Sequence, residues 1–444
     1  KIAPQMLLTT VDQAVYRTQR SPAGPVHLNL MFREPLAPTP AAVPPPYLDQ
    51  LERWQQSDAA YSTYFLSFPE TAEPALQELA EILAGTRRGL LVAGKLDNRG
   101  EQDAVRQLAA KLRFPVFADI RSGLRLGFSD PIHIAYFDQL LFSEKFRRRF
   151  QPELILHFGG QPLSKRFLQY LENYPPKKYV VVANHPFRQD PAHRVTHRIE
   201  ADISSFSRDL PVSNSGKIDS AWLEEISAAS QKIDRLLREE LNVTERLSEP
   251  AVARAISQII PADQALFVAS SMPIRDLDMF ADPGGAPVPV AANRGASGID
   301  GTIASAAGFA GGLGKPVTLL IGDLAFLHDL NSLSLLNRLQ QPLTIVLLNN
   351  HGSGIFSFLP IAGFPDVFEK YFATPHTCRF EAAARMFDIN YRKPQTLTEF
   401  KEVYQKALGS NHSTLIEVQT DREQNVLLHK KLQKKIIEML KKQS

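Results

Sequence analysis

The chain has 444 residues, a length that suits about three domains with sizeable cores. Apolar residues make up 44% and charged residues 22%, as in ordinary globular proteins, and no apolar run approaches the ~20 residues needed to span a membrane. The formal net charge of +3 is too small to indicate a nucleic-acid partner. Cys378 is the only cysteine, which excludes an internal disulfide and favours a reducing, cytoplasmic location.

The beginning of the chain predicts one helix and one strand. Residues 4–20 have apolar residues at helical spacing, and residues 25–31 alternate like a strand. One helix and one strand cannot bury a core alone. Either the chain is a fragment, or this segment packs on the domain that follows. We expect the fragment, with residues 1–34 as the end of a domain that begins upstream. The inward face of the helix is predicted to consist of Leu7, Leu8, Val11 and Val15.

A proline-rich stretch and an α/β region follow. The prolines between positions 35 and 46 predict an extended linker within residues 35–74. Residues 75–215 alternate strands and helices, which indicates a central domain with a mostly parallel sheet. Lys165 opens one helix, where it would strengthen anion binding or simply be solvated beside a helix cap. Strands are expected at 90–93, 116–119, 154–158 and 179–183, and helices at 76–84, 101–112, 135–150 and 164–173.

Residues 216–444 predict a second parallel sheet. A long helix over 217–246 leads into it, and strands are expected at 266–269, 288–291, 317–321, 343–348 and 413–418. Helical spacing between the third and fourth strands predicts a strand–helix–strand unit, so their carboxyl ends share one edge. Arg275 and Arg294 follow the first two strands. Arginine binds carboxylates with a two-pronged fork, although a strand-end arginine also suits a salt bridge.

The next two strand ends carry hard oxygen ligands. Asp323 follows one strand, and Asn350 and Gly352 follow the other. Mg²⁺ prefers near-octahedral oxygen from one or two side chains together with phosphate oxygens and water. These two side chains and the Gly352 carbonyl would suit Mg²⁺ or Mn²⁺ held against a diphosphate. The same residues also fit a helix cap and a turn.

Several segments together resemble a known enzyme family. Gly322-Asp323-Leu324 and Asn349-Asn350 resemble the metal-binding signature of thiamine diphosphate enzymes. Residues 271–276, the loop 293–301 (Asn-Arg-Gly-Ala-Ser-Gly-Ile-Asp-Gly) and residues 349–360 are similar to the 2-succinyl-5-enolpyruvyl-6-hydroxy-3-cyclohexene-1-carboxylate synthases of menaquinone and phylloquinone biosynthesis.

The resemblance implies an α/β thiamine diphosphate-binding fold built from three-layer domains with parallel sheets. Residues 1–34 would be the remnant of the pyrimidine-binding domain, 75–215 a Rossmann-like central domain, and 216–444 the domain that binds thiamine diphosphate and Mg²⁺. It also implies that the enzyme decarboxylates 2-oxoglutarate and adds the succinyl carbanion equivalent to isochorismate. A homodimer or homotetramer with the site shared between subunits is expected.

The resemblance also assigns roles to individual residues. The residues that match contacts to substrate carboxylates are Arg275, Arg294 and Lys165. The residues that match metal ligands are Asp323, Asn350 and Gly352. The residues that match cofactor contacts are Ser271, Ile299, Gly322, Asp323, Leu324, Asn350, Gly352, Ile355, Phe356 and Leu359.

Two other functions fit the same motifs. One is a different thiamine diphosphate-dependent 2-oxoacid decarboxylase or carboligase, which needs fewer cations. The other is a non-catalytic module of this fold. The activating glutamate of the family belongs to the first domain, which is nearly absent from the sequence, so we expect this chain alone to be inactive.

Overall fold

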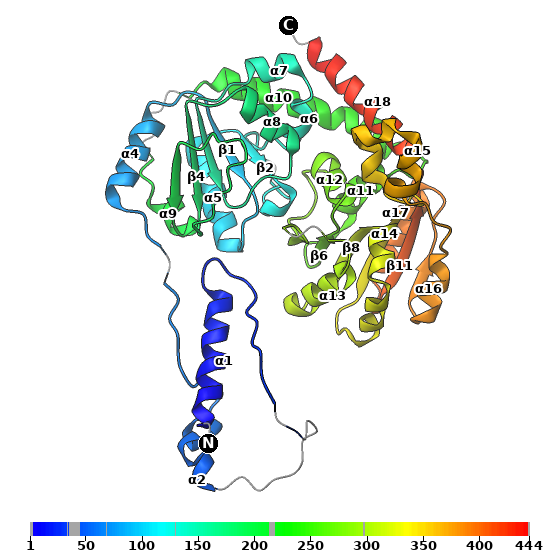
Figure 1. Ribbon diagram of the computed structural model, residues 1–444. Coiled ribbons are helices and arrows are strands. Elements are labelled where there is room, and N and C mark those ends of the chain that lie inside the picture. Colours follow the sequence, from blue (N-terminus) through cyan, green and yellow to red (C-terminus); the bar gives the residue numbers. More distant parts are fainter. Residues whose placement is uncertain are drawn as a thin grey trace.

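The computed structural model describes residues 3–32, 34, 45–67, 69–128, 130–212, 218–295 and 298–442. It contains a five-stranded and a six-stranded sheet, both parallel, which lie side by side (Figure 1). The predicted α/β class with parallel sheets is confirmed. Pro35, Pro38, Pro40 and Pro44 of the predicted linker lie outside the described residues, and the domain boundaries stay a prediction.

The first sheet has the strand order β2-β1-β3-β4-β5. Its inner strands are continuous apolar runs because a parallel sheet is covered on both faces. Strand β5 was not predicted, since it is an edge strand that reads His-Arg-Ile-Glu and lacks such a run. The strands are β1 (Gly89–Ala93), β2 (Val116–Ala118), β3 (Leu154–Phe158), β4 (Lys178–Ala183) and β5 (His197–Glu200).

Helices cover both faces of the first sheet. The prediction of one helix over residues 135–150 is wrong, because the chain forms two short helices there. The side chain of Ser143 accepts a hydrogen bond from Phe146 N and starts the second helix. The helical segments are α4 (Glu73–Ala84), α5 (Arg99–Leu112), η2 (Ile120–Ser122), α6 (Phe137–Leu140), α7 (Glu144–Arg149), α8 (Lys165–Asn173) and α9 (Ile203–Asp209).

The second sheet has the strand order β10-β11-β9-β8-β6-β7. From β6 the chain first adds β7 on one side, and then crosses back to place β8 and β9 on the other. Ligands of open parallel sheets bind where the direction of strand addition reverses, here between β6 and β8. The strands are β6 (Ala265–Val268), β7 (Val290–Ala292), β8 (Val317–Gly322), β9 (Leu343–Asn349), β10 (Asn390–Arg392) and β11 (Thr414–Gln419).

The predicted helix over residues 217–246 is shorter than expected. The α-helix, α10, comprises Ser220–Leu237 and continues into a π-helical turn, η3 (Arg238–Asn242). The buried helix α11 (Glu249–Ile259) follows. The remaining helical segments are α12 (Met272–Phe280), α13 (Thr302–Leu313), α14 (Asp323–His328), η4 (Leu330–Arg338), η5 (Gly354–Phe358), η6 (Pro360–Gly363), α15 (Pro365–Phe368), η7 (Glu369–Ala373), α16 (Phe380–Met386), α17 (Leu397–Leu408) and α18 (Arg422–Lys441).

The N-terminal segment differs most from expectation. Helix α1 (Pro4–Gln19) forms as predicted but stands apart from both sheets (Figure 1). Its predicted inward face is wrong, since Leu7, Val11 and Val15 are 42–53% exposed. The predicted strand at residues 25–31 is also wrong: the described backbone there pairs with no neighbouring strand. Three short helical segments follow: α2 (Pro45–Leu48), η1 (Asp49–Leu51) and α3 (Glu52–Gln55).

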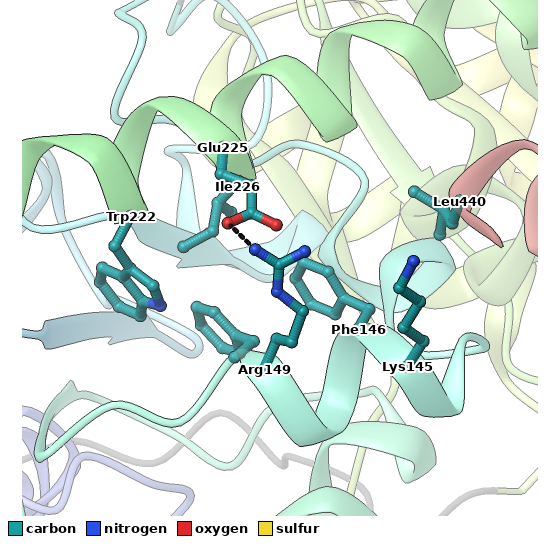
Figure 2. Close-up of a pocket in the computed structure, with 8 residues that line it drawn as sticks. Lys145, Phe146, Arg149, Trp222, Glu225, Ile226 and Leu440 are labelled. Atoms are coloured by element: carbon teal, nitrogen blue, oxygen red, sulfur yellow. Dashed lines mark hydrogen bonds and ion pairs between the residues drawn. The ribbon is translucent and has the colours of Figure 1, made fainter. Parts of the chain in front are cut away.

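The two sheet regions share one hydrophobic core that contains residues of both. The C-terminal helix α18 runs back to α6, α7 and α10 of the first region. At this junction Trp222 stacks on Phe150 with ring centroids 5.1 Å apart. Figure 2 shows the ion pair of 3.0 Å between Arg149 and Glu225 beside Trp222. The cavity between them is about 30 Å³, enough for one water molecule. No helix in the described part of the chain is long and apolar enough to cross a membrane.

Candidate functional site

A cleft of about 80 Å³ lies at the carboxyl ends of β6, β8 and β9. Three larger cavities, of about 580, 650 and 540 Å³, occur elsewhere in the described part of the chain, the first of them sharing Glu249 with the cleft, so volume alone does not identify the site. The polar residues at the strand ends do identify it. The structure brings these predicted cofactor contacts together in the cleft: Ser271, Ile299, Gly322, Asp323, Leu324, Asn350 and Gly352.

Asp323 is buried at the end of β8, with 2% of its surface exposed. Its Oδ2 accepts hydrogen bonds from Asn350 N at 3.1 Å and Gly352 N at 3.0 Å, and its Oδ1 accepts one from Leu324 N at 2.7 Å. His376 Nε2 lies 3.1 Å from Oδ2. Burial raises the pKa of Asp323, while the Gly352 amide and His376 oppose that rise. The two carboxylate oxygens are thus fixed by the backbone of the strand ends.

The two asparagines that follow β9 have different partners. Asn349 Nδ2 donates to Glu417 Oε1 on β11 at 2.8 Å, a structural contact. Asn350 Nδ2 donates to Glu249 Oε1 at 2.8 Å, but Asn350 Oδ1 is buried without any hydrogen-bond partner. A buried acceptor without a partner is rare and costly, so it points to a ligand. Because Asn350 lines the cleft, its unpartnered Oδ1 is a candidate ligand atom for a group bound there.

Glycine is required where the chain turns beside these ligands. Gly352 has φ +149°, and a Cβ there would lie 2.4 Å from Ala373 O. A Cβ at Gly354 would lie 2.7 Å from Asn350 Nδ2. No L-residue with a side chain fits either position without displacement of its neighbours. The backbone can therefore approach a bound group closely at this turn.

These oxygen donors suit a hard cation that is coordinated partly by the protein and partly by a bound molecule. The site combines a buried carboxylate, an unpartnered amide oxygen and a glycine turn. The described residues contain no cluster of three histidine, cysteine or acidic side chains that would hold a metal by protein atoms alone. Mg²⁺ commonly takes one or two protein side chains and completes its octahedron with phosphate oxygens and water. The residues present therefore fit Mg²⁺ bound together with a diphosphate.

Two arginines lie beside the cleft, although neither lines it. Arg275 lies on α12 and is only partly exposed, and its guanidinium donates to the Ser271 carbonyl. Burial and the nearby Arg294 both lower the pKa of Arg275. Ser271 has φ +76°, an unfavourable conformation for a residue with a side chain. Strained backbone and two mutually repelling cations next to the cleft are typical of a site that receives an anionic ligand.

A buried ion pair lies in the first sheet region, at the end of β2. Asp119, fully buried after β2, forms two hydrogen bonds with the Arg121 side chain, at 3.0 and 2.9 Å. Arg121 also donates to Gln161 O, and Asp119 accepts from Leu163 N in the loop that carries the exposed Lys165. Burial and Arg121 lower the pKa of Arg294, so Arg121 acts electrostatically on the second sheet's loop.

The same pair is joined to α12. Ile120 N donates to Asp278 Oδ1 at 2.8 Å, across the boundary between the two sheet regions. Burial and the nearby Asp119 raise the pKa of Asp278 to about 8. The loop that carries Lys165 and the helix that carries Arg275 are thus both attached to the segment 119–121. No direct contact brings Lys165 itself to the cleft.

Some predicted residues lie beside the cleft rather than in it. Ile355 and Phe356 belong to η5, whose first residue, Gly354, lines the cleft, and Leu359 follows that turn with 42% of its surface exposed. Ala296 and Ser297 of the loop before Ile299 lie outside the described residues.

The sequence analysis missed three residues near the site: Arg121, Glu249 and His376. The polar strand end at Asp119 could have indicated Arg121, and the helix-start signal at residues 248–250 could have indicated Glu249. His376 lies in an irregular segment that carried no signal.

The comparisons with known proteins agree with this geometry. The chain matches the family models for the middle domain of thiamine pyrophosphate enzymes, over residues 45–268, and for the C-terminal TPP-binding domain of thiamine pyrophosphate enzymes, over residues 289–418. It is 50% identical to a 2-succinyl-5-enolpyruvyl-6-hydroxy-3-cyclohexene-1-carboxylate synthase of Rubrobacter xylanophilus, covering 97% of this chain and 74% of the relative. The synthase of Chlorobaculum tepidum is 45% identical, with coverages of 97% and 73%.

A solved structure shares the fold. A Mycobacterium smegmatis protein described as a thiamin diphosphate-dependent enzyme superposes with a TM-score of 0.59 at 18% identity, over 82% of this chain and 68% of that one. At this identity the likeness concerns the arrangement of strands and helices alone.

Proposed function

Because the chain belongs to the family of 2-succinyl-5-enolpyruvyl-6-hydroxy-3-cyclohexene-1-carboxylate synthases, we propose that it decarboxylates 2-oxoglutarate and transfers the succinyl group to isochorismate. It is a transferase that depends on thiamine diphosphate. The observation that carries the proposal is the unpartnered, buried Asn350 Oδ1 in a cleft that also contains the Asp323 carboxylate.

We propose that Asp323, Asn350 and Gly352 hold Mg²⁺, or Mn²⁺ in its place, against the diphosphate of the cofactor. Thiamine diphosphate supplies the carbanion chemistry that amino-acid side chains lack. The protein contributes a buried carboxylate whose orientation the backbone amides hold. Ile299, Leu324 and Ser271 also line the cleft and would contact the part of the cofactor next to its diphosphate. A cation at this point would stabilise the ionised carboxylate and so oppose the rise in the pKa of Asp323 that burial causes.

Arg275 and Arg294 are proposed to bind the carboxylates of the substrates, with Lys165 as a third cation. Arg275 is partly buried, Arg294 is exposed, and the two positive charges repel each other. A dicarboxylate between them would replace this repulsion with charge-assisted hydrogen bonds. The arginines would thus orient the substrate and would discriminate 2-oxoglutarate from a monocarboxylic 2-oxoacid such as pyruvate.

We also propose that the protein acts in the cytoplasm as a homodimer or homotetramer, with the site shared between subunits. The exposed apolar face of α1, formed by Leu7, Val11 and Val15, supports an assembly that covers it. Light scattering after size-exclusion chromatography measures the oligomeric state. A monomer at micromolar concentration would rule out this arrangement.

The function is tested in the full-length protein encoded by the gene. Calorimetry should show thiamine diphosphate binding only when Mg²⁺ is present, and an assay with 2-oxoglutarate and isochorismate should show product. Pyruvate should be used with lower kcat/KM, because it cannot engage a second cation. Equal use of pyruvate would contradict the substrate assignment, and failure to bind the cofactor would contradict the whole proposal.

A further inference from the structure

Glu249 is a buried carboxylate that contacts a proposed metal ligand, Asn350, through the NH₂ group of its amide. It is the first residue of α11, is 1% exposed and lines the cleft. Its Oε1 accepts two hydrogen bonds, from Asn350 Nδ2 at 2.8 Å and from Thr420 Oγ1 at 3.1 Å. These three residues come from α11, the end of β9 and the end of β11, so only the folded chain brings them together.

The orientation of an asparagine side chain depends on its neighbours. Its amide has an oxygen and an NH₂ group of nearly equal size, and rotation by half a turn exchanges them. Oε1 of Glu249 already receives the Thr420 hydroxyl and is therefore an acceptor. It pairs with the NH₂ end of Asn350 and not with the oxygen. Asn350 Oδ1 is consequently left without a protein partner.

We infer that Glu249 is the positioning residue that keeps Asn350 Oδ1 available to the cation and prevents the amide from turning its NH₂ group toward it. This inference rests on the proposed function. Burying a carboxylate is costly, and an apolar residue would stabilise the same position better. Hydrogen-bond partners outside the metal ligands commonly contribute tenfold to a hundredfold in metal affinity.

The test is Glu249→Leu, which fills similar space but removes the acceptor. In the full-length protein with saturating thiamine diphosphate, titration calorimetry with Mg²⁺ should show affinity lowered roughly 10–100-fold. Glu249→Gln retains an acceptor oxygen and should bind Mg²⁺ close to wild type. Glu101→Leu is the matched control: Glu101 is also in the first turn of a helix and is 2% exposed, but it lies in the first sheet region. Its Mg²⁺ affinity should be unchanged.

Thermal unfolding shows whether each variant is folded, and Glu249→Met repeats the test if the leucine variant is not. Wild-type Mg²⁺ affinity in a folded Glu249→Leu or Glu249→Met variant would overturn the inference. Equal loss in Glu249→Gln would do so too, because the acceptor would then not be what matters. Asp323→Ala distinguishes failure of the proposed metal site from failure of the proposed role of Glu249. If it also binds like wild type, the metal site itself is wrong; if it alone loses binding, only the role of Glu249 is wrong.

Discussion

Each sheet has a buried aspartate directly after one of its strands, and the two aspartates have different surroundings. Asp119 follows β2 and Asp323 follows β8, and both are buried, with 0% and 2% of their surface exposed. Asp119 is neutralised by the two-pronged contact with Arg121. Asp323 receives backbone amides and His376, and shares its cleft with the unpartnered oxygen of Asn350. A carboxylate that the fold already pairs with arginine holds the structure together, whereas one without arginine or lysine remains available to a cation.

The largest effect is expected from removing each aspartate in turn. Asp323→Ala should abolish Mg²⁺-dependent binding of thiamine diphosphate, because the diphosphate loses its bridging cation. Asp119→Ala should keep that binding but lower the free energy of unfolding, since Arg121 loses its partner. Calorimetry and thermal unfolding measure the two effects. Unchanged cofactor affinity in Asp323→Ala would show that Asp323, like Asp119, is not a metal ligand.

The arginines extend the same comparison. Arg275→Ala should leave cofactor binding intact and cost roughly 2–5 kcal/mol in the use of dicarboxylates. That corresponds to about 30-fold or more in kcat/KM. Arg121→Ala, on the paired side, should mainly lower the unfolding temperature. Steady-state kinetics with 2-oxoglutarate and isochorismate measure the first effect, and wild-type kinetics for both substrates in Arg275→Ala would end its role as a carboxylate contact.

The glycines at the strand ends should separate folding from ligand binding. A Cβ at Gly94, after β1, would lie 1.6 Å from Gly160 O, inside the first sheet region. Gly94→Ala should therefore destabilise the protein by about 3 kcal/mol, measured by denaturant unfolding. Gly352→Ala, with a Cβ 2.4 Å from Ala373 O, should distort the cleft and weaken Mg²⁺ binding. If both variants lose only stability, the turn at Gly352 has no special link to the ligand.

The smallest effect concerns pH. Burial raises the pKa of Glu101 from 4.5 to about 7. Between these values the folded protein holds a proton that the unfolded chain has lost, so stability falls as pH rises through this window. Glu101→Gln cannot ionise and can still accept the hydrogen bond from Asp97 N. It should match wild type near pH 4 and be more stable by roughly 2 kcal/mol at pH 8. Equal denaturation midpoints at both pH values would contradict this.

Local sequence signals were enough for five of the six strands of the sheet that carries the candidate site; the three-residue edge strand β10 was missed. Buried parallel strands must be continuous apolar runs, and polar residues directly after them must lie at one edge. For this reason Arg275, Arg294, Asp323 and Asn350 could be proposed from the sequence as candidates, and the structure places Asp323 and Asn350 together at that edge. The same signal at Asp119 could have indicated the ion pair with Arg121. The edge strands β5 and β10 were missed, and α6 and α7 were predicted as one helix, because these short segments have no long periodic pattern.

The sequence by itself determined the parallel α/β architecture and the polar groups at its strand ends, because apolar runs, glycines and breakers act over a few neighbouring residues. Only the tertiary structure decided how those groups are used. It placed Glu249 against Asn350 and His376 against Asp323, and it left the apolar face of α1 uncovered although its periodicity predicted burial. A hydrogen bond between residues that are distant in the chain depends on how strands and helices pack, and that packing is a property of the whole fold rather than of any local segment.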